Sequence, residues 1–248
     1  MAKHKNLIII IIIVALIGIY LNRAYAYIYS KFELISPPAE KNYMTEEKGQ
    51  RMTYVAIGDS LTAGVGATSA ATSLPGALAQ KIAAASGVQV IVNNLGVPGA
   101  TSFDILTGQV IAAGQMQPQM ITLFIGTNDM HNFVPREKFK SNLETAVRSL
   151  QQIAQAQIYL INLPYLGARD LVLPPYNWYF ELELKEYNAV IAEVAQETGV
   201  KLIDLHTISA KPFSADQKAV SGAYSADRFH PSDRGYALWA DLIYDIIQ

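Results

Sequence analysis

Short, unbroken apolar runs alternate with longer segments of helical periodicity across most of this 248-residue chain. The runs predict strands buried on both faces, because half-exposed strands alternate apolar and polar residues instead. The longer segments carry apolar residues at helical spacing, which predicts amphipathic helices. The predicted strands are residues 54–57, 88–92, 120–125, 158–163 and 200–205. The predicted helices are residues 74–85, 102–113, 135–155, 178–198 and 232–247.

This alternation of strands and helices predicts an α/β fold, in which helices cover both faces of a mostly parallel sheet. We therefore expect a three-layer α/β/α sandwich of flavodoxin-like type, with a five-stranded sheet in the order 2-1-3-4-5. Ligands of such sheets bind beyond the carboxyl ends of the strands. Candidate site residues should therefore follow predicted strands directly.

The N-terminus carries an uninterrupted apolar run of fifteen residues, Leu7 to Leu21, behind Lys3 and Lys5. A charged start before an apolar stretch is typical of export signals and membrane anchors. Two interpretations remain open: cleavage after Ala24-Tyr25-Ala26 and secretion, or an uncleaved helix that extends toward Tyr29 with tyrosines at the membrane interface. We favour the anchor because of the tyrosines. Both interpretations place the rest of the chain outside the cytoplasm, since the lysines stay inside.

The chain therefore divides into three segments. Residues 1–30 are the membrane anchor or signal peptide. Residues 31–51 are polar and contain Pro37 and Pro38, which predicts a linker that spaces the domain from the membrane. Residues 52–248 form the predicted globular domain.

Composition narrows the classes of function. The net charge is −2 and no basic patch indicates nucleic acid, while a hydrophobic share of 51% suffices for a sizeable core. The chain has no cysteine, which excludes disulfides, a cysteine nucleophile and cysteine-ligated metals. No histidine-rich spacing indicates another metal site. No feature of the sequence indicates an oligomeric state.

The most informative motif is Gly58-Asp59-Ser60-Leu61, which directly follows the first predicted strand. A serine delivered into a tight turn at the carboxyl end of a strand is a candidate nucleophile. Serine is also common in turns and at the start of helices, so the motif alone does not decide between the two roles. Three later motifs favour the nucleophile.

Two of these motifs could supply hydrogen-bond donors to a developing negative charge. Gly96 lies in a Gly- and Pro-containing segment after the second strand, where a residue without a side chain can bring its backbone N–H close to a ligand. Asn128 follows the third strand within Gly126-Thr127-Asn128-Asp129, and its side-chain amide can donate to an oxyanion. Ordinary turns and helix caps also use these residue types.

The last motif, Asp227-Arg228-Phe229-His230-Pro231, precedes the final predicted helix. A nucleophilic serine needs a base that takes its proton and a carboxylate that orients the base. Asp227 and His230 are three residues apart, a spacing that lets their side chains meet. The rival pair among the four histidines is Asp204 with His206, while His131 has no acid at a useful spacing.

In this order, the four motifs resemble those of the SGNH/GDSL hydrolase family of serine esterases and lipases. The resemblance covers residues 54–248, and the family shares the three-layer fold expected above. The serine motif Gly58-Asp59-Ser60-Leu61 differs from the Gly-x-Ser-x-Gly elbow of ordinary α/β-hydrolases. The continuation Gly64-Val65-Gly66-Ala67 is looser than in the family, and residues 167–179 look like an insertion that forms either a rim over the pocket or a packed connection.

The resemblance implies a mechanism for ester hydrolysis without a metal or organic cofactor. Ser60 would attack the ester carbonyl, His230 would act as the base, and Asp227 would orient the imidazole. The backbone N–H groups of Ser60 and Gly96 and the side chain of Asn128 would form the oxyanion hole. Asp59, Asp129 and Asn94 are assigned structural roles.

Three alternatives to an esterase or lipase stay open. An extracytoplasmic acyltransferase or deacetylase acting on cell-envelope sugars would use the same residues and differ in the acyl acceptor. A non-catalytic binding module would retain the fold, although it would not require four complete motifs. A metal-dependent hydrolase would require ligands that the sequence does not suggest. Small-molecule esters, lipid esters, thioesters and acetylated sugars all remain candidate substrates.

Overall fold

A computed structural model describes residues 2–248 of the chain except 33–34, 154, 166–170, 172–173, 175 and 215–221. Its sheet strands are β1 (Tyr43–Met44), β2 (Arg51–Gly58), β3 (Gln89–Asn94), β4 (Met120–Phe124), β5 (Gln157–Ile161) and β6 (Lys201–Ile203). Its longer helices are α1 (Ala2–Phe32), α3 (Leu74–Ser86), α7 (Arg136–Ile153), α8 (Tyr176–Thr198), α9 (Leu205–Ser214) and α10 (Asp233–Ile247). Its shorter helices are α2 (Ser60–Ala63), η1 (Ala70–Thr72), α4 (Ser102–Thr107), α5 (Gln109–Gln115) and α6 (Thr127–His131).

The sheet confirms the predicted α/β fold and its topology. Its strand order is β1-β3-β2-β4-β5-β6, and the five strands from β2 to β6 are all parallel. Counted along the chain, these five strands have the predicted order 2-1-3-4-5. Strand β4 is buried at every position, as its continuous apolar run predicts, and it lies at the centre of the sheet.

The sheet has one strand more than the sequence predicted. Residues 43–44, assigned to a linker above, pair antiparallel with β3 at the edge of the sheet. Thr45 continues the contact, since its backbone N–H donates to the Val90 carbonyl at 3.1 Å and its hydroxyl accepts from the Val90 N–H at 3.0 Å. Two residues are too few for a recognisable apolar alternation, which is why the pattern missed this strand.

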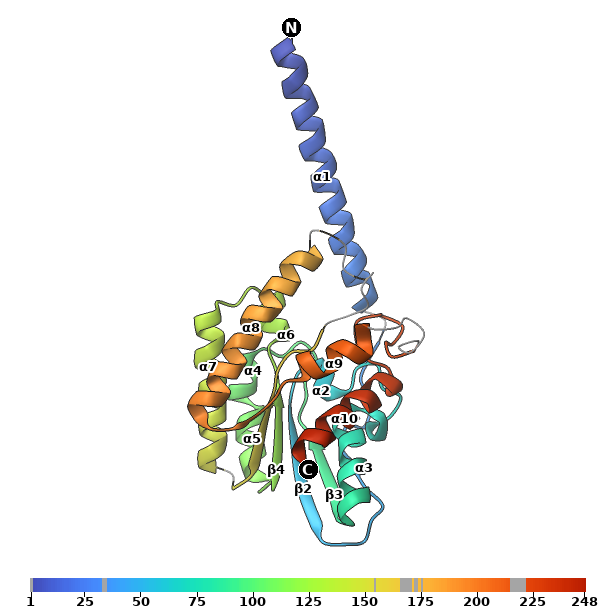
Figure 1. Ribbon diagram of the computed structural model, residues 1–248, viewed down its shortest axis with the longest axis vertical. Coiled ribbons are helices and arrows are strands. Elements are labelled where there is room, and N and C mark those ends of the chain that lie inside the picture. The colour runs from blue at the N-terminus through green and yellow to red at the C-terminus, as the bar shows by residue number, and fades with distance from the viewer. Residues whose placement is uncertain are drawn as a thin grey trace.

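Helices cover both faces of the sheet, as the alternation predicted (Figure 1). Helices α3 and α10 pack together on one face, and α4, α5, α7 and α8 cover the other. The largest fully buried side chains come from both strands and helices and include Tyr54, Phe124, Phe139, Tyr187 and Tyr236. The layers therefore hold the carboxyl ends of β2, β3 and β4 in fixed positions beside one another.

The helices differ from the prediction mainly in their details. The segment predicted as one helix over residues 102–113 is two helices, because the chain turns at Gly108. The short helices α2, η1 and α6 and the ten-residue helix α9 were not predicted, and α9 begins at Leu205, where a strand was expected. Helix α3 begins as expected, with the Ser73 hydroxyl accepting from the Gly76 N–H and proline in its first turn.

Helix α1 extends away from the sheet layers as a long single helix (Figure 1). Its segment Asn6–Tyr27 has 22 residues and is long and apolar enough to cross a membrane. By these criteria it is the one such helix among the described residues, and it is compatible with either a signal peptide or an anchor. In its second half it contacts the domain: the Tyr20 hydroxyl donates to the Pro174 carbonyl at 3.0 Å.

The substitution Thr45→Val tests whether the segment before β2 belongs to the folded domain. We expect the free energy of unfolding to fall by about 1–2 kcal/mol, because the buried Val90 N–H loses its acceptor. Urea denaturation of the full chain in detergent, followed by circular dichroism, measures the change. Thr145→Val, at an exposed position of α7, is the matched control and should change stability by less than about 0.5 kcal/mol. Equal values for both variants would contradict a stabilising role of this segment.

Candidate active site

Ser60 lies where β2 ends and the short helix α2 begins. Asp59 caps this helix, because its side chain accepts from the Leu61 N–H at 3.0 Å. As the first residue of the helix, Ser60 has a backbone N–H with no partner inside the helix. The serine side chain is partly exposed, whereas Asp59 beside it is fully buried. The local structure thus presents Ser60 at the carboxyl edge of the sheet, as predicted.

A buried glutamine fixes the end of β2 just before the serine. Gln109 accepts from the Gly58 N–H at 2.8 Å and donates to the Gly58 carbonyl at 2.9 Å. A Cβ atom at Gly58 would overlap the Phe124 carbonyl oxygen and the Thr62 hydroxyl, so no larger residue fits there. Nothing in the sequence pointed to Gln109, because a glutamine within a helix carries no local signal of such a contact.

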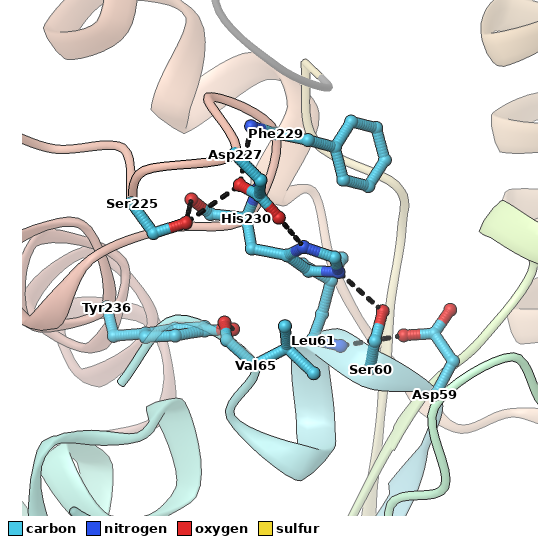
Figure 2. Close-up of polar contacts among 9 residues, drawn as sticks. All are labelled: Asp59, Ser60, Leu61, Val65, Ser225, Asp227, Phe229, His230 and Tyr236. Carbon is cyan, nitrogen blue, oxygen red and sulfur yellow. Dashed lines mark hydrogen bonds and ion pairs between the residues drawn. The ribbon is translucent and has the colours of Figure 1, made fainter. Parts of the chain in front are cut away.

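Ser60, His230 and Asp227 form a continuous hydrogen-bonded series (Figure 2). The Ser60 Oγ atom lies 2.9 Å from His230 Nε2, and His230 Nδ1 lies 2.5 Å from Asp227 Oδ2. The structure thus brings together three predicted site residues from opposite ends of the domain. Asp227 is fully buried and His230 nearly so, whereas Ser60 is reachable from solvent.

The loop before α10 holds the Asp227 carboxylate in its ionised form. Its Oδ1 atom accepts from the Ser225 hydroxyl at 2.7 Å and from the backbone N–H groups of Phe229 and His230, each at 2.9 Å. Burial alone would raise the pKa of Asp227, but the hydrogen bond and charge of His230 and these further donors keep the pKa below its usual value. The turn requires a left-handed backbone at Arg228, with φ of 62°.

Asn128 lies in the first turn of α6, directly after β4, with its side chain partly exposed. Its Nδ2 atom donates one hydrogen to the Ala100 carbonyl at 2.9 Å, which leaves the second hydrogen of this amide for another acceptor. The neighbouring Asp129 is fully buried and accepts from both the hydroxyl (2.6 Å) and the N–H (2.8 Å) of Ser102. Asp129 therefore joins α6 to α4, consistent with its predicted structural role.

Gly96 differs from the prediction in the use of its N–H group. That N–H donates to Asn94 Oδ1 at 3.0 Å, and Asn94 Nδ2 in turn donates to the Thr62 carbonyl at 2.7 Å. A Cβ atom at Gly96 would overlap the backbone of Ala63, so the glycine is needed for the close approach of this loop to α2. Asn94 thus has the structural role expected of it, while the Gly96 N–H is engaged within the protein.

The other two candidate histidines, His206 and His131, make different contacts. Asp204 accepts from the Asn162 side chain at 2.7 Å and from the Thr207 N–H at 3.1 Å at the start of α9. Its neighbour His206 bonds through its backbone to Asn162, so this rival pair is not the one placed at Ser60. His131 packs against Phe180, and burial lowers its pKa to about 4, which keeps it neutral at physiological pH.

Two further expectations concern bound groups and the insertion. Among the described residues, no three His, Asp or Glu side chains are grouped so that they could hold a metal ion. Of the predicted insertion over residues 167–179, only Leu171, Pro174 and residues 176–179 lie within the described residues. Residues 176–179 form the first turn of α8 rather than a separate loop.

This arrangement is suited to nucleophilic chemistry. A hydroxyl within hydrogen-bond distance of an imidazole, whose other nitrogen contacts a buried carboxylate, is the geometry that activates a serine. The carboxylate fixes the ring so that Nε2 faces the hydroxyl. A side-chain amide donor and the first N–H of a helix lie at the same edge of the sheet, where they could bind a developing oxyanion.

Comparisons with known proteins agree with this geometry. The model of the GDSL-like Lipase/Acylhydrolase family matches residues 56–238. A GDSL-like esterase of Mycobacterium tuberculosis is 30% identical over 196 residues, which cover 76% of this chain and 59% of that esterase. This chain therefore matches less than two thirds of the length of that relative.

Solved structures show the same fold. The lipase/acylhydrolase from Enterococcus faecalis is 27% identical, with a TM-score of 0.59, and the alignment covers 79% of this chain and 95% of that one. An acetylxylan esterase from Geobacillus stearothermophilus has a TM-score of 0.60 at 20% identity, over 80% of this chain and 95% of that one. At that lower identity, the second likeness concerns the fold alone.

The substitution Gln109→Leu tests the bond that fixes the end of β2. We expect the free energy of unfolding to fall by about 2 kcal/mol, because the buried Gly58 N–H loses its acceptor. Gln115→Leu, at an exposed position of the same helix, should change stability by less than about 0.5 kcal/mol in the same urea titration. A Gln109→Leu variant as stable as this control would show that the contact contributes nothing.

The substitution Asp59→Asn tests the buried carboxyl beside the serine. Burial, with a smaller contribution from the charge of Asp129, raises the pKa of Asp59 to about 7, against about 4 in an unfolded chain. At Asp59 the folded state therefore binds more protons between about pH 4 and pH 7, and the contribution of this carboxyl to stability falls as the pH rises through this window.

Asparagine retains an oxygen that accepts from the Leu61 N–H but cannot ionise. We expect the stability of Asp59→Asn relative to wild type to increase from pH 4 to pH 7, by an amount on the order of 3–4 kcal/mol. Thermal denaturation at half-unit pH steps measures this difference. A constant difference between the two proteins across the window would contradict the raised pKa.

Proposed function

Because the chain belongs to the GDSL-like lipase/acylhydrolase family, we propose that it hydrolyses carboxylic esters with Ser60 as the nucleophile, His230 as the base and Asp227 as the residue that orients the base. The observation that carries this proposal is the series of contacts from Ser60 Oγ to His230 Nε2 at 2.9 Å and from His230 Nδ1 to Asp227 at 2.5 Å. The rival pair of Asp204 and His206 has no such contact with the serine.

In the first half of the reaction, Ser60 Oγ attacks the ester carbonyl carbon while its proton moves to His230 Nε2. The resulting imidazolium is stabilised by the buried Asp227 carboxylate, which is already ionised because three donors surround its other oxygen. His230 then gives the proton to the leaving alcohol as the carbon–oxygen bond breaks. The acyl group remains on Ser60.

The carbonyl oxygen becomes negatively charged when the serine attacks, and this charge needs fixed donors. We assign two: the Ser60 backbone N–H at the start of α2 and the second hydrogen of Asn128 Nδ2. The structure gives no support for the predicted third donor, Gly96, because its N–H is donated to Asn94. Gly96 instead has a packing role, because its loop lies close against α2. Asn94 holds this loop in place by donating to the Thr62 carbonyl.

In the second half of the reaction, a water molecule takes the place of the leaving alcohol. His230 removes a proton from this water as its oxygen attacks the acyl carbon, and the proton then returns to Ser60 Oγ as the acyl–serine bond breaks. The products are the free acid and the original serine. All of these steps use residues of this chain alone.

We further propose that α1 anchors the enzyme in a membrane with the domain on the extracytoplasmic side. The segment Asn6–Tyr27 is long enough to span, and Lys3 and Lys5 precede it, which favours a cytoplasmic N-terminus. Its contact with the domain supports retention of the helix, since Tyr20 hydrogen-bonds to Pro174 and Ala24 is buried.

Hydrolysis of p-nitrophenyl acetate by the full chain in detergent tests the proposed residues. We expect Ser60→Ala and His230→Ala each to lose at least about a thousandfold in kcat, because each removes a member of the triad. Asn128→Ala should lose about a hundred- to thousandfold, the usual cost of one oxyanion donor.

Two matched controls separate these effects from general damage. Ser86→Ala replaces an exposed serine at the end of α3, and His206→Ala replaces the rival histidine. For both variants we expect kcat to stay within about threefold of the wild-type value. This is well below the tenfold change in rate that corresponds to about 1.4 kcal/mol of activation free energy. Loss of activity in His206→Ala with retention in His230→Ala would refute the assignment of the base.

A further inference from the structure

Exposed apolar side chains gather on two adjoining elements near the base of α1. Phe133, in the turn after α6, is 69% exposed, and Trp178 at the start of α8 is 65% exposed. Tyr179 and Leu182 on α8 are also exposed, and Leu182 lies four residues after Trp178 and three after Tyr179, so it neighbours both on the helix surface. The rings of Phe133 and Tyr179 are in contact, with centroids 6.0 Å apart. These four residues, here called the apolar rim, are therefore one contiguous surface.

Hydrogen bonds hold the apolar rim at a defined height along α1. The Tyr20 hydroxyl donates to the Pro174 carbonyl at 3.0 Å, and the Tyr176 hydroxyl donates to the Leu21 carbonyl at 3.4 Å. Trp178 lies only two residues beyond Tyr176. Figure 1 shows the start of α8 beside the end of α1 that meets the domain.

This height is where a bilayer surface would lie. The uninterrupted apolar run of α1 ends at Leu21, where these hydrogen bonds lie, and the polar residues Asn22 and Arg23 follow it. The whole 22-residue segment Asn6–Tyr27 measures about 33 Å as a helix, close to the roughly 30 Å of a bilayer hydrocarbon core. The domain-proximal end of that segment carries Tyr20, Tyr25 and Tyr27, all exposed. Tyrosine and tryptophan favour the membrane interface, so Trp178 and Tyr179 have the side chains expected at this depth.

The backbone at Phe133 supports an outward-facing role for its ring. Its φ angle is 55°, a left-handed conformation that is unfavourable for a bulky residue. Such strain persists where the surrounding structure imposes it, and it is found most often at functional sites. Here it accompanies an aromatic ring that packs against Tyr179 and otherwise faces solvent.

Ring contacts connect the apolar rim to the proposed base. Successive pairs of rings lie in contact along this path. The distances between their centroids are 5.0 Å for His230–Phe229, 5.9 Å for Phe229–His131, 5.1 Å for His131–Phe180, 5.7 Å for Phe180–Tyr179 and 6.0 Å for Tyr179–Phe133. His131 belongs to this series as a neutral ring, since burial lowers its pKa to about 4. A continuous series of ring contacts thus extends from the proposed base to the exposed surface.

We propose that the apolar rim inserts into the surface of the bilayer that α1 crosses, and that Ser60 receives amphiphilic long-chain esters from this membrane. The part concerning the substrate rests on the proposed function. Docking is apolar rather than ionic, because the charged neighbours of the rim on α8 include Glu181 and Glu183. A zwitterionic phosphatidylcholine bilayer therefore suffices as the docking surface.

Tryptophan fluorescence of the full chain in phosphatidylcholine vesicles tests the docking. The chain has two tryptophans, and Trp239 is only 2% exposed, so Trp178 is the natural surface probe. We expect lipids brominated on their acyl chains to quench part of the emission, and we expect Trp178→Phe to abolish that quenching. Quenching of Trp178 by aqueous iodide but not by bromolipid would refute docking.

Hydrolysis of two esters with the same leaving group tests the substrate class. One is p-nitrophenyl palmitate dissolved in the vesicle bilayer, and the other is p-nitrophenyl acetate in water. The variants are Phe133→Asn, in which asparagine tolerates the left-handed backbone, and Leu182→Gln. Ile111→Gln is the matched control, because Ile111 on α5 and Leu182 are both 58% exposed.

We expect each rim variant to hydrolyse the palmitate about five- to tenfold more slowly and the acetate within twofold of wild type, with no change in the control. Equal losses on both esters, or none on the palmitate, would refute delivery from the membrane. Wild-type activity on the acetate alone would refute the substrate class but leave the esterase assignment intact. Activity on neither ester would refute the proposed function, whereas the bromolipid result would still decide the docking.

Discussion

The contact between the buried Asp227 carboxylate and His230 is the interaction on which the rest of the site depends. It fixes which imidazole nitrogen faces Ser60, and it does so from a loop 170 residues further along the chain. Burying a carboxylate is costly, and the loop offsets this cost with donors from Ser225, Phe229 and His230. The left-handed turn at Arg228 brings these donors to one oxygen, so the other oxygen is directed at the histidine.

Buried polar side chains hold the remaining parts of the site against the sheet. Gln109 secures the strand that delivers the serine, Asn94 ties the Gly96 loop to α2, and Asp129 joins the helix of Asn128 to α4. None of the three contacts the proposed nucleophile in the structure. Gln109 and Asn94 bond the backbone on either side of Ser60, at Gly58 and Thr62, while Asp129 holds the helix of Asn128 by accepting from Ser102. Such support keeps donors in place before the reaction and reduces the reorganisation that charge development would require.

The position of α1 determines which side of the domain would face a membrane. The helix joins the domain beside the start of α8, and the exposed rings of Phe133 and Trp178 lie on the same part of the surface. An esterase with this layout would meet its substrate at a membrane surface, where long-chain esters are concentrated. In the proposed arrangement the site supplies the chemistry and the N-terminal helix supplies access to a class of substrate.

Local sequence patterns determined the α/β alternation and singled out Ser60, Asn128, Asp227 and His230 as candidates, because strand burial and turn chemistry leave signals within a few residues. The expected sheet order came from the fold type that this alternation indicates. The strand at residues 43–44, the contacts of Gln109 and the engagement of the Gly96 N–H left no such signal. The choice of His230 over His206 could be argued from spacing but was decided by distance to Ser60. Each of these outcomes depends on partners far apart in the chain, and only the packing of the sheet and its helices determines which of them meet.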